Sequence, residues 1–288
     1  MPHVYTGRVR VRHHELDPFG RVQPAVYLRY LAQAAVEASS DAGFDARWYA
    51  NAGAHWIIRR SLFEVFRPAL AGEQLSVRTW VEDFRRVRSH RRYEVRDRAG
   101  EVKLWALTDW VYVDAVSGRP RRVPDEMTAG FGLPSDRPAA ERPPWSAPAP
   151  AAAPARTPHR VRFADLDSLG HMNNAAYLDV LVQAVLDVLS DVGWPLDRLA
   201  SSGALPWVAA GDIEYLGSAR YDDRLETTTW FRVAADGVDV HQAVERAGEG
   251  SRPLVRANTR WRWTRAADGV AEPTPGALLS ALRPLLAA

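Results

Sequence analysis

The chain has 288 residues, of which 47% are hydrophobic and 25% are charged, and this composition is typical of a globular protein long enough for two domains. A formal net charge of +2 argues against a dedicated nucleic-acid binder, which normally carries a strong basic excess. The absence of cysteine excludes disulfides, thiolate metal sites and a cysteine nucleophile, and no run approaches 18 apolar residues. We therefore expect a soluble, cytoplasmic protein that binds no nucleic acid and does not insert into a membrane.

The sequence repeats itself at an offset of 150 residues. Residues 11–43 read VRHHELDPFGRVQPAVYLRYLAQAAVEASSDAG, and residues 161–193 read VRFADLDSLGHMNNAAYLDVLVQAVLDVLSDVG. The two segments align without a gap, and 14 of the 33 positions are identical. The offset slips by one residue where Thr-Asp-Trp at 108–110 meets Thr-Arg-Trp at 259–261. Self-similarity at a domain-sized period indicates two copies of one fold.

Residues 132–158 are rich in proline and alanine. Such a composition is not expected to hold a β-ladder or a helix, and it favours an extended, polyproline-like geometry. The sequence therefore predicts a linker at 132–158 between an N-terminal domain at 1–131 and a C-terminal domain at 159–272. The last segment, 273–288, predicts a short helix on the surface.

Both copies show the same predicted order of elements. A short strand, at 4–13 and at 160–163, precedes a polar loop and one long helix. The helices are predicted at 25–42 and 175–192, and each is followed by a glycine in the position that favours a helix end. Period-two patterns then predict strands at 76–84, 90–97 and 104–114 in the first copy and at 224–234, 238–247 and 255–265 in the second. One buried helix followed by a meander indicates an α+β fold with an antiparallel sheet curled around a central helix.

The loop before the second long helix carries a longer motif. Its sequence, VRFADLDSLGHMNNAAYLD, resembles the opening of hotdog-fold thioesterases of the 4-hydroxybenzoyl-CoA thioesterase type, whose pattern runs approximately D-x-D-x-x-G-H-V-N-N-x-x-Y-L. The matching residues are Asp165, Asp167, Gly170, His171, Asn173, Asn174, Tyr177 and Leu178. The first copy is similar to a second variant of the family, which keeps Asp17 and Gly20 but has Arg21 in place of the histidine. The tandem layout is similar to that of acyl-ACP thioesterases, although Leu169 and Ser218 stand where those enzymes carry asparagine and an acidic residue.

The resemblance implies two tandem hotdog domains and hydrolysis of an acyl-CoA or acyl-ACP thioester. In this family the second aspartate of the motif activates water or attacks the carbonyl, so Asp167 and Asp17 are the candidate carboxylates, and the fuller motif favours Asp167. Backbone N–H groups at the start of a central helix would hold the oxyanion. His171 and Asn173 are further catalytic candidates, but a structural hydrogen bond explains His171 equally well, and helix capping explains Asn173 or Asn174.

Several further residues are candidate contacts to the substrate. Gly170, Gly20, Asn174 and Tyr177 belong to this group, although Tyr177 lies on the buried face of its helix, where core packing explains it better. Seven arginines fall within residues 83–98. The resemblance implies that arginines at this position hold the phosphates of coenzyme A. They would also attract an acidic carrier protein. A charged, solvent-exposed edge strand explains them equally well. The subset predicted to share one face of the strand is Arg86, Arg88 and Arg92.

No cofactor and no metal site are predicted, because cysteine is absent and the histidines lack the spacing of metal ligands. Two other functions stay open beside thioester hydrolysis: a non-catalytic, acyl-CoA-binding hotdog protein, and a hotdog dehydratase or hydratase. Homo-oligomers of the tandem chain are also compatible with the sequence.

Overall fold

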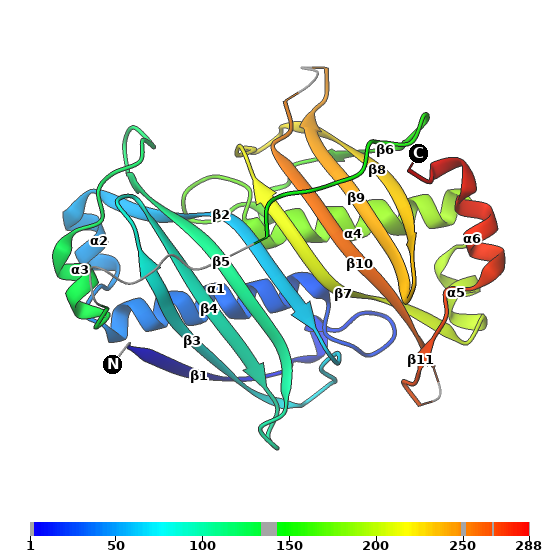
Figure 1. Cartoon of the computed structure of the whole chain (residues 1–288). Helices are drawn as coiled ribbons and strands as arrows, with labels where there is room; N and C mark the ends of the chain where they lie inside the picture. Colours follow the sequence, from blue (N-terminus) through cyan, green and yellow to red (C-terminus); the bar gives the residue numbers. More distant parts are fainter. Residues whose placement is uncertain (1–2, 134–142, 249–251, 267, 288) are drawn as a thin grey trace. The chain divides into compact units, whose positions relative to one another are not determined.

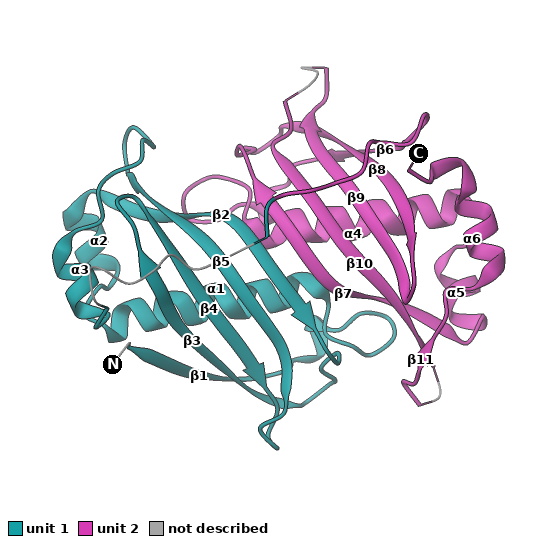
Figure 2. Cartoon of the chain, viewed as in Figure 1, with its two compact units in different colours: residues 1–144 teal, residues 145–288 magenta. Residues whose placement is uncertain are grey.

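The computed structural model describes residues 3–133, 143–248, 252–266 and 268–287. The chain divides into two compact units, Met1–Pro144 (unit 1) and Trp145–Ala288 (unit 2), which Figure 2 draws in teal and magenta.

Unit 1 contains one sheet and one long helix. Its elements, in chain order, are β1 (Val4–Arg10), η1 (His13–Glu15), α1 (Pro24–Asp41), α2 (Ala46–Ala52), β2 (Ala54–Val65), β3 (Gln74–Phe84), β4 (Arg88–Arg96), β5 (Val102–Asp114) and α3 (Asp125–Gly130). All strand pairs are antiparallel, in the order β1-β3-β4-β5-β2. The long helix α1 lies along one face of this sheet and contacts β1 and β3 (Figure 1).

Unit 2 repeats the same topology. Its elements are β6 (Ala155–Arg160), η2 (Phe163–Asp165), α4 (Asn174–Asp191), α5 (Leu196–Ser201), β7 (Ala204–Tyr215), β8 (Arg224–Ala234), β9 (Gly237–Arg246), β10 (Val255–Arg265), β11 (Ala271–Glu272), α6 (Gly276–Leu282) and η3 (Arg283–Leu285). The strand order β6-β8-β9-β10-β7 matches that of unit 1 element for element, with β11 added beside β10. The predicted α+β class, an antiparallel sheet with one long central helix in each copy, is confirmed.

The long helices are held in the core by the same contact in both units. Tyr27 is buried on α1, and its hydroxyl accepts a hydrogen bond from the backbone N–H of Ala69 at 2.7 Å. Tyr177 is buried on α4, and its hydroxyl accepts one from Ala219 at 2.9 Å. Each bond satisfies a buried N–H in the loop that follows β2 or β7 and so ties that loop to the helix.

The predicted linker is partly wrong. Strand β6 occupies residues 155–160, and Pro158 pairs there with Glu226 of β8. A proline is tolerated on β6 because it is the edge strand of unit 2, and N–H groups on the outer side of an edge strand have no ladder partner. Residues 134–142 of the predicted linker lie outside the described part of the chain.

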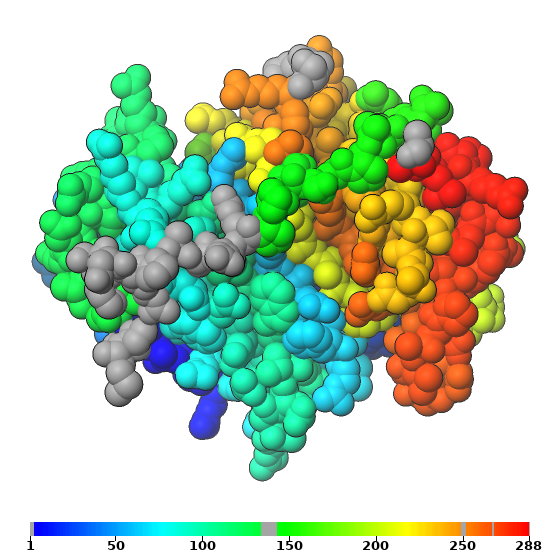
Figure 3. Space-filling model, viewed as in Figure 1, coloured from blue at the N-terminus to red at the C-terminus, as the bar shows by residue number. Residues whose placement is uncertain are grey.

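Residues 145–154, which we call the strap, run over the face of the unit 2 sheet that points away from α4 (Figure 1), and Figure 3 shows this segment in green. The side-chain amide of Asn258 donates to the carbonyl of Ser146 at 2.7 Å. The guanidinium of Arg256 lies 4.9 Å from the ring centroid of Trp145. The strap is thus attached to strand β10.

A row of ionisable side chains crosses three strands of unit 1. The strand register places Asp83, His90 and Asp109 next to one another, and all three are buried. His90 Nδ1 lies 2.8 Å from Asp83 Oδ1, and His90 Nε2 lies 3.9 Å from Asp109 Oδ1. The imidazole ring of His90 therefore stands between the side chains of two aspartates.

The matching row of unit 2 has the opposite order of acidic and basic residues. Asp239 on β9 is paired with Arg232 on β8 and with Arg260 on β10, at 2.8 and 2.7 Å. Burial opposes ionisation of Asp239, but the hydrogen bonds from the two guanidinium groups prevail and lower the pKa of its carboxyl. Here one carboxylate stands between two cations.

Candidate active site

The two aspartate loops share one backbone conformation. In each loop the aspartate N–H bonds to the carbonyl four residues further on, at 2.6 Å for Asp17 and 2.9 Å for Asp167. Gly20 and Gly170 have φ of +80° and +72°, and each donates its N–H to the aspartate carbonyl at 3.0 Å. A positive φ explains why glycine stands at both positions.

Asp17 is held by Arg21 and by the loop backbone. Its Oδ1 accepts the backbone N–H groups of Phe19 and Arg21, both at 2.9 Å, and its Oδ2 lies 3.2 Å from the Arg21 Nε. The Arg21 side chain is buried, and desolvation lowers the pKa of its guanidinium although Asp17 acts in the opposite direction. The carboxylate of copy one is therefore neutralised by a neighbouring cation.

Asp167 is much less constrained. Its Oδ1 accepts the backbone N–H of Leu169 at 2.9 Å, whereas its Oδ2 has no hydrogen bond with any residue that the structure describes. His171 takes the place of Arg21, and its half-buried ring likewise bonds to none of the described residues. The carboxylate of copy two is oriented through one oxygen and available through the other.

The acidic residues two positions earlier orient the loops. Glu15 Oε2 accepts the backbone N–H of Arg12 at 2.7 Å and the hydroxyl of Tyr30 at 2.6 Å. Asp165 Oδ2 accepts the N–H of Arg162 at 2.7 Å, and the Arg162 guanidinium donates to Oδ1 at 2.8 Å. Burial opposes these bonds, but they lower the pKa of the Asp165 carboxyl. The bond to Tyr30 joins residues 15 positions apart and could not be predicted from the motif.

The long helices begin differently in the two copies. Asn173 is the N-cap of α4, and its Oδ1 accepts the N–H of Ala175 at 2.9 Å, so the predicted cap is present. Asn174 is the first residue of that helix. In α1 the N-cap is Gln23, whose side chain caps no helix N–H, and the first residue is Pro24. The start of α1 therefore lacks a side-chain cap.

Tyr177 has a packing role. Its side chain is buried, its hydroxyl is bonded to the loop after β7, and burial raises its pKa to about 12. These contacts account for the residue without a substrate.

The arginine-rich segment divides into three groups. Arg86 lies in the turn between β3 and β4, so the prediction that it shares a strand face with Arg88 and Arg92 is wrong. Arg88 begins β4 and is exposed, and the Nε of Arg92 donates to Glu82 Oε1 at 2.9 Å. Arg91 points to the opposite face and is buried.

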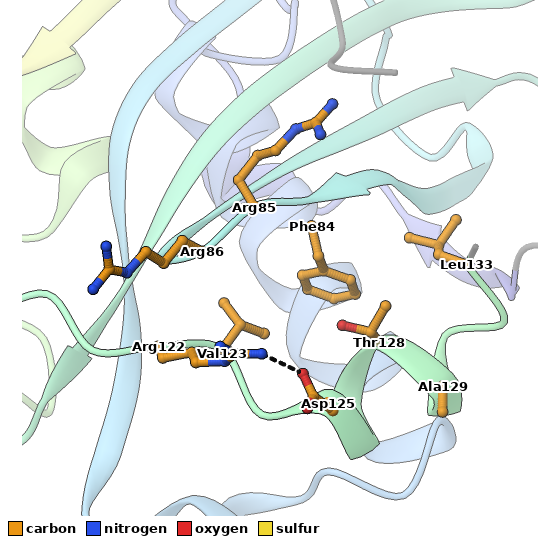
Figure 4. Close-up of a pocket in the computed structure, with 9 residues that line it drawn as sticks. All are labelled: Phe84, Arg85, Arg86, Arg122, Val123, Asp125, Thr128, Ala129 and Leu133. Atoms are coloured by element: carbon orange, nitrogen blue, oxygen red, sulfur yellow. Dashed lines mark hydrogen bonds and ion pairs between the residues drawn. The ribbon is translucent and has the colours of Figure 1, made fainter. Parts of the chain in front are cut away.

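A pocket of about 660 Å³ lies beside this turn in unit 1. It is lined by Phe84, Arg85, Arg86, Arg122, Val123, Asp125, Thr128, Ala129 and Leu133. Figure 4 shows that the side chains of Arg85 and Arg86 point in different directions. Arg122 donates to Asp125 at 3.2 Å, which neutralises a third guanidinium. The pocket is cationic at its rim, but its arginines do not converge on one point.

The described part of the chain contains neither a metal-ligand cluster nor a membrane-spanning helix. No group of three or more His, Cys, Asp or Glu side chains there is arranged to hold a metal ion. No helix there is long and apolar enough to span a bilayer.

Each copy of the chain matches a model of a known protein family. Residues 2–131 match the acyl-ACP thioesterase N-terminal domain, and residues 161–282 match the thioesterase-like superfamily. A Bacillus subtilis protein provisionally named as the acyl-CoA thioesterase YneP is 28% identical over 131 residues, covering 44% of this chain and 95% of that protein.

Two solved structures show the same fold over nearly the whole chain. One is a Lactobacillus plantarum protein provisionally named an oleoyl thioesterase, with a TM-score of 0.78, 19% identity, and coverage of 91% of this chain and 96% of that chain. The other is a 12:0-ACP thioesterase from Umbellularia californica, with a TM-score of 0.70, 19% identity, and coverage of 91% and 94%. The chain thus has the tandem fold of these two thioesterases, and its two copies match the models of the acyl-ACP thioesterase N-terminal domain and of the thioesterase-like superfamily.

Proposed function

We propose that this protein hydrolyses acyl thioesters, and that Asp167 is the carboxylate that activates water or attacks the carbonyl. One observation carries the assignment. Two loops of the same conformation hold an aspartate, but Arg21 neutralises Asp17, whereas Asp167 Oδ2 has no hydrogen bond with the described residues. A base or nucleophile needs a lone pair that no cation already occupies.

The loop around Asp167 offers further groups for the reaction. Attack on the thioester carbonyl places negative charge on its oxygen, which N–H groups at the start of a central helix can stabilise. The ring of His171 is available to bind the carbonyl or the attacking water, because no described residue bonds to it. Collapse of the adduct breaks the C–S bond, and the thiolate takes up a proton and leaves as the free thiol. If Asp167 activates water, the carboxylic acid forms in the same step; if Asp167 attacks the carbonyl itself, a water molecule then hydrolyses the acyl-aspartate anhydride and releases the acid. The side-chain oxygen of Asn173 already accepts a hydrogen bond as the cap of α4, which leaves the amide nitrogen of this side chain to contact the substrate.

The substrate we propose is an acyl chain on acyl carrier protein or on coenzyme A. The match of residues 2–131 to the acyl-ACP thioesterase N-terminal domain supports the carrier protein. Both carriers present phosphate, and carrier proteins are also acidic. The exposed Arg86 and Arg88 are placed to attract such a surface, and guanidinium groups suit phosphate.

The test compares two matched substitutions. Asp167→Asn keeps the shape of the side chain but removes the base, so thiol release from an acyl-CoA and acyl-ACP panel should fall roughly 10²–10⁴-fold. Asp17→Asn is the control, because its carboxylate is already paired with Arg21, and it should lower the rate far less. Loss of activity in Asp17→Asn alone would reverse the assignment. No thiol release from any thioester by the folded wild-type protein would favour the non-catalytic acyl-binding alternative.

A further inference from the structure

Arg91 is a buried cation on the helix-facing side of β4. Only 7% of the residue is exposed. Its guanidinium carbon lies 5.3 Å from the centroid of the Phe131 ring, and its Nη1 lies 3.5 Å from the hydroxyl of Thr79. Among the described residues, no carboxylate forms an ion pair with it and no other acceptor bonds to its remaining N–H groups.

This arrangement leaves a charge without compensation. Arginine remains protonated in proteins, so the site cannot relieve the charge by losing a proton. Desolvation lowers the pKa of Arg91, and its charge interactions are with the hydroxyls of Tyr93 and Tyr49 rather than with an anion. The neighbouring Arg92, on the other face of the strand, is paired with Glu82. A buried cation without a counter-ion is costly, and the contacts with Phe131 and Thr79 compensate only part of that cost, so an anion beside Arg91 would be favourable.

The second copy shows that the fold does not need a cation at this place. In unit 1, Arg91 lies opposite Val81 in the strand register. The residue equivalent to Val81 at the 150-residue offset is Phe231, which lies opposite Val240. Val240 therefore corresponds to Arg91. Unit 2 thus fills the position with the buried side chain of Val240. The guanidinium is a feature that unit 1 alone carries.

The helix opposite Arg91 is also less bulky than its counterpart. The last buried turns of α1 present Ala35, Ala38 and Ser39, whereas α4 presents Val185, Val188 and Leu189 at the same offset. The buried side chains near the C-terminal end of α1 are therefore smaller than their counterparts on α4.

The surrounding core cluster is aromatic but retains an unused polar group. It contains Phe44, Tyr112 and Phe131, with Trp56 and Phe84 packed against it. The Tyr112 hydroxyl is fully buried and has no hydrogen bond with any described residue. An apolar site with one cation and one free hydroxyl is suited to the end of an aliphatic chain that carries a carboxylate.

We propose that Arg91 binds the carboxylate of an aliphatic chain that enters the aromatic cluster at the C-terminal end of α1. The proposal rests on the proposed function, because a thioesterase handles two such carboxylates: the distal carboxylate of a dicarboxylic acyl group, and the carboxylate of the fatty acid that it releases.

Direct binding tests the proposal independently of hydrolysis. Dodecanoate and dodecanedioate should each raise the thermal unfolding midpoint of the wild-type protein, and Arg91→Met should abolish that rise. Arg91→Lys keeps the charge and should retain a reduced rise. Arg96→Met is the matched control, because Arg96 lies on the same strand but bonds to Glu94 on the outer face, and it should respond as the wild type does. Dodecanol, which has no carboxylate, should act equally on all four proteins.

Kinetics then separates the two sources of the carboxylate. If the ligand is a dicarboxylic acyl group, kcat/KM for dodecanedioyl-CoA should exceed that for dodecanoyl-CoA by about tenfold, and Arg91→Met should remove this preference. If the ligand is the released acid, inhibition by dodecanoate should weaken about tenfold in Arg91→Met while the ratio between the two thioesters stays unchanged.

An equal midpoint shift by dodecanoate in the wild type and in Arg91→Met would overturn the proposal. Should Arg91→Met fail to fold, Arg91→Gln provides the same comparison. Absence of hydrolysis would count against the proposed function alone, since the binding result does not depend on turnover.

Discussion

Arg21 and His171 occupy the same place in the two copies, and this one difference decides the state of the neighbouring carboxylate. A guanidinium four residues after Asp17 reaches back across the loop and forms an ion pair with it. The imidazole of His171 forms no such bond with the described residues, and Asp167 keeps one oxygen available. The shared backbone conformation therefore supports a salt bridge in unit 1 and a candidate base in unit 2.

His241 on β9 gives a pH dependence that can be assigned to one ring. It is 3% exposed, and its Nδ1 lies 2.6 Å from Asn258 Oδ1. Because the Asn258 amide nitrogen donates to Ser146, its Oδ1 accepts, so Nδ1 of His241 carries the proton of the neutral ring. Burial lowers the pKa of His241 below its ordinary value of 6.5.

The lowered pKa of His241 determines how the stability of the folded protein changes with pH. Below about pH 6.5 the unfolded chain binds a proton at His241 that the folded chain does not, so stability falls as the pH decreases from 6.5 to the folded pKa. We expect the urea midpoint of the wild type to drop between pH 7.5 and pH 5.5, and the drop to be smaller in His241→Gln. His13, which is exposed, provides the control substitution. Equal drops in the wild type and in His241→Gln would exclude this ring as the origin.

At the scale of elements, β4 serves different purposes on its two faces. The outer side and the preceding turn carry exposed cations, whereas the inner side carries the buried Arg91. The period of two along a strand makes this division possible within nine residues.

The outer cations can be tested through the salt dependence of substrate binding. The double variant Arg86→Gln/Arg88→Gln should raise KM for acyl-ACP roughly two- to tenfold with little change in kcat, because exposed ion pairs contribute modestly to binding. It should also flatten the increase of KM with salt, since less attraction remains to be screened. Arg96→Gln, further along β4, should leave both quantities unchanged. An unaltered KM and salt response in the double variant would place carrier binding elsewhere.

Sequence periodicity predicted the elements whose burial alternates regularly. Both long helices were predicted within one residue of their ends, because each has a continuous apolar face and a terminal glycine. Strands β2 and β7 were missed: both contain a bulge that breaks the alternation, and β7 also includes Pro206 and Gly211. The helices α2, α3 and α5 have six or seven residues, too few for a helical period to be recognised.

The candidate site was predictable only where it is local in sequence. The aspartates, the turn glycines and the Asn173 cap all lie in one short motif. The Asp17–Arg21 ion pair depends on a side-chain conformation that no motif specifies. Arg91 meets Phe131, 40 residues further along the chain, and only the three-dimensional arrangement shows that no described carboxylate accompanies it.

At the scale of the molecule, the strap extends unit 2 beyond its first strand. Trp145→Ala in the full chain removes the ring that lies on Arg256, and it should lower the unfolding free energy by about 0.5–1 kcal/mol. The midpoint of thermal unfolding should fall by a few degrees, whereas Trp145→Phe should retain most of the stability. An unchanged midpoint in Trp145→Ala would mean that the strap adds nothing to the stability of unit 2.

The rows of ionisable side chains in the two units have opposite orders of acidic and basic residues, and this difference disfavours one form of misfolding of a duplicated chain. Two copies with the same topology can exchange strands during folding, a known failure of repeated domains. Pairing β5 of the first copy with β9 of the second would oppose Asp109 to Asp239, two carboxylates that are buried in their own units. Like charges directly across strands are unfavourable, and burial increases the penalty. The pairing of β9 with β5 in place of β4 is therefore disfavoured by charge.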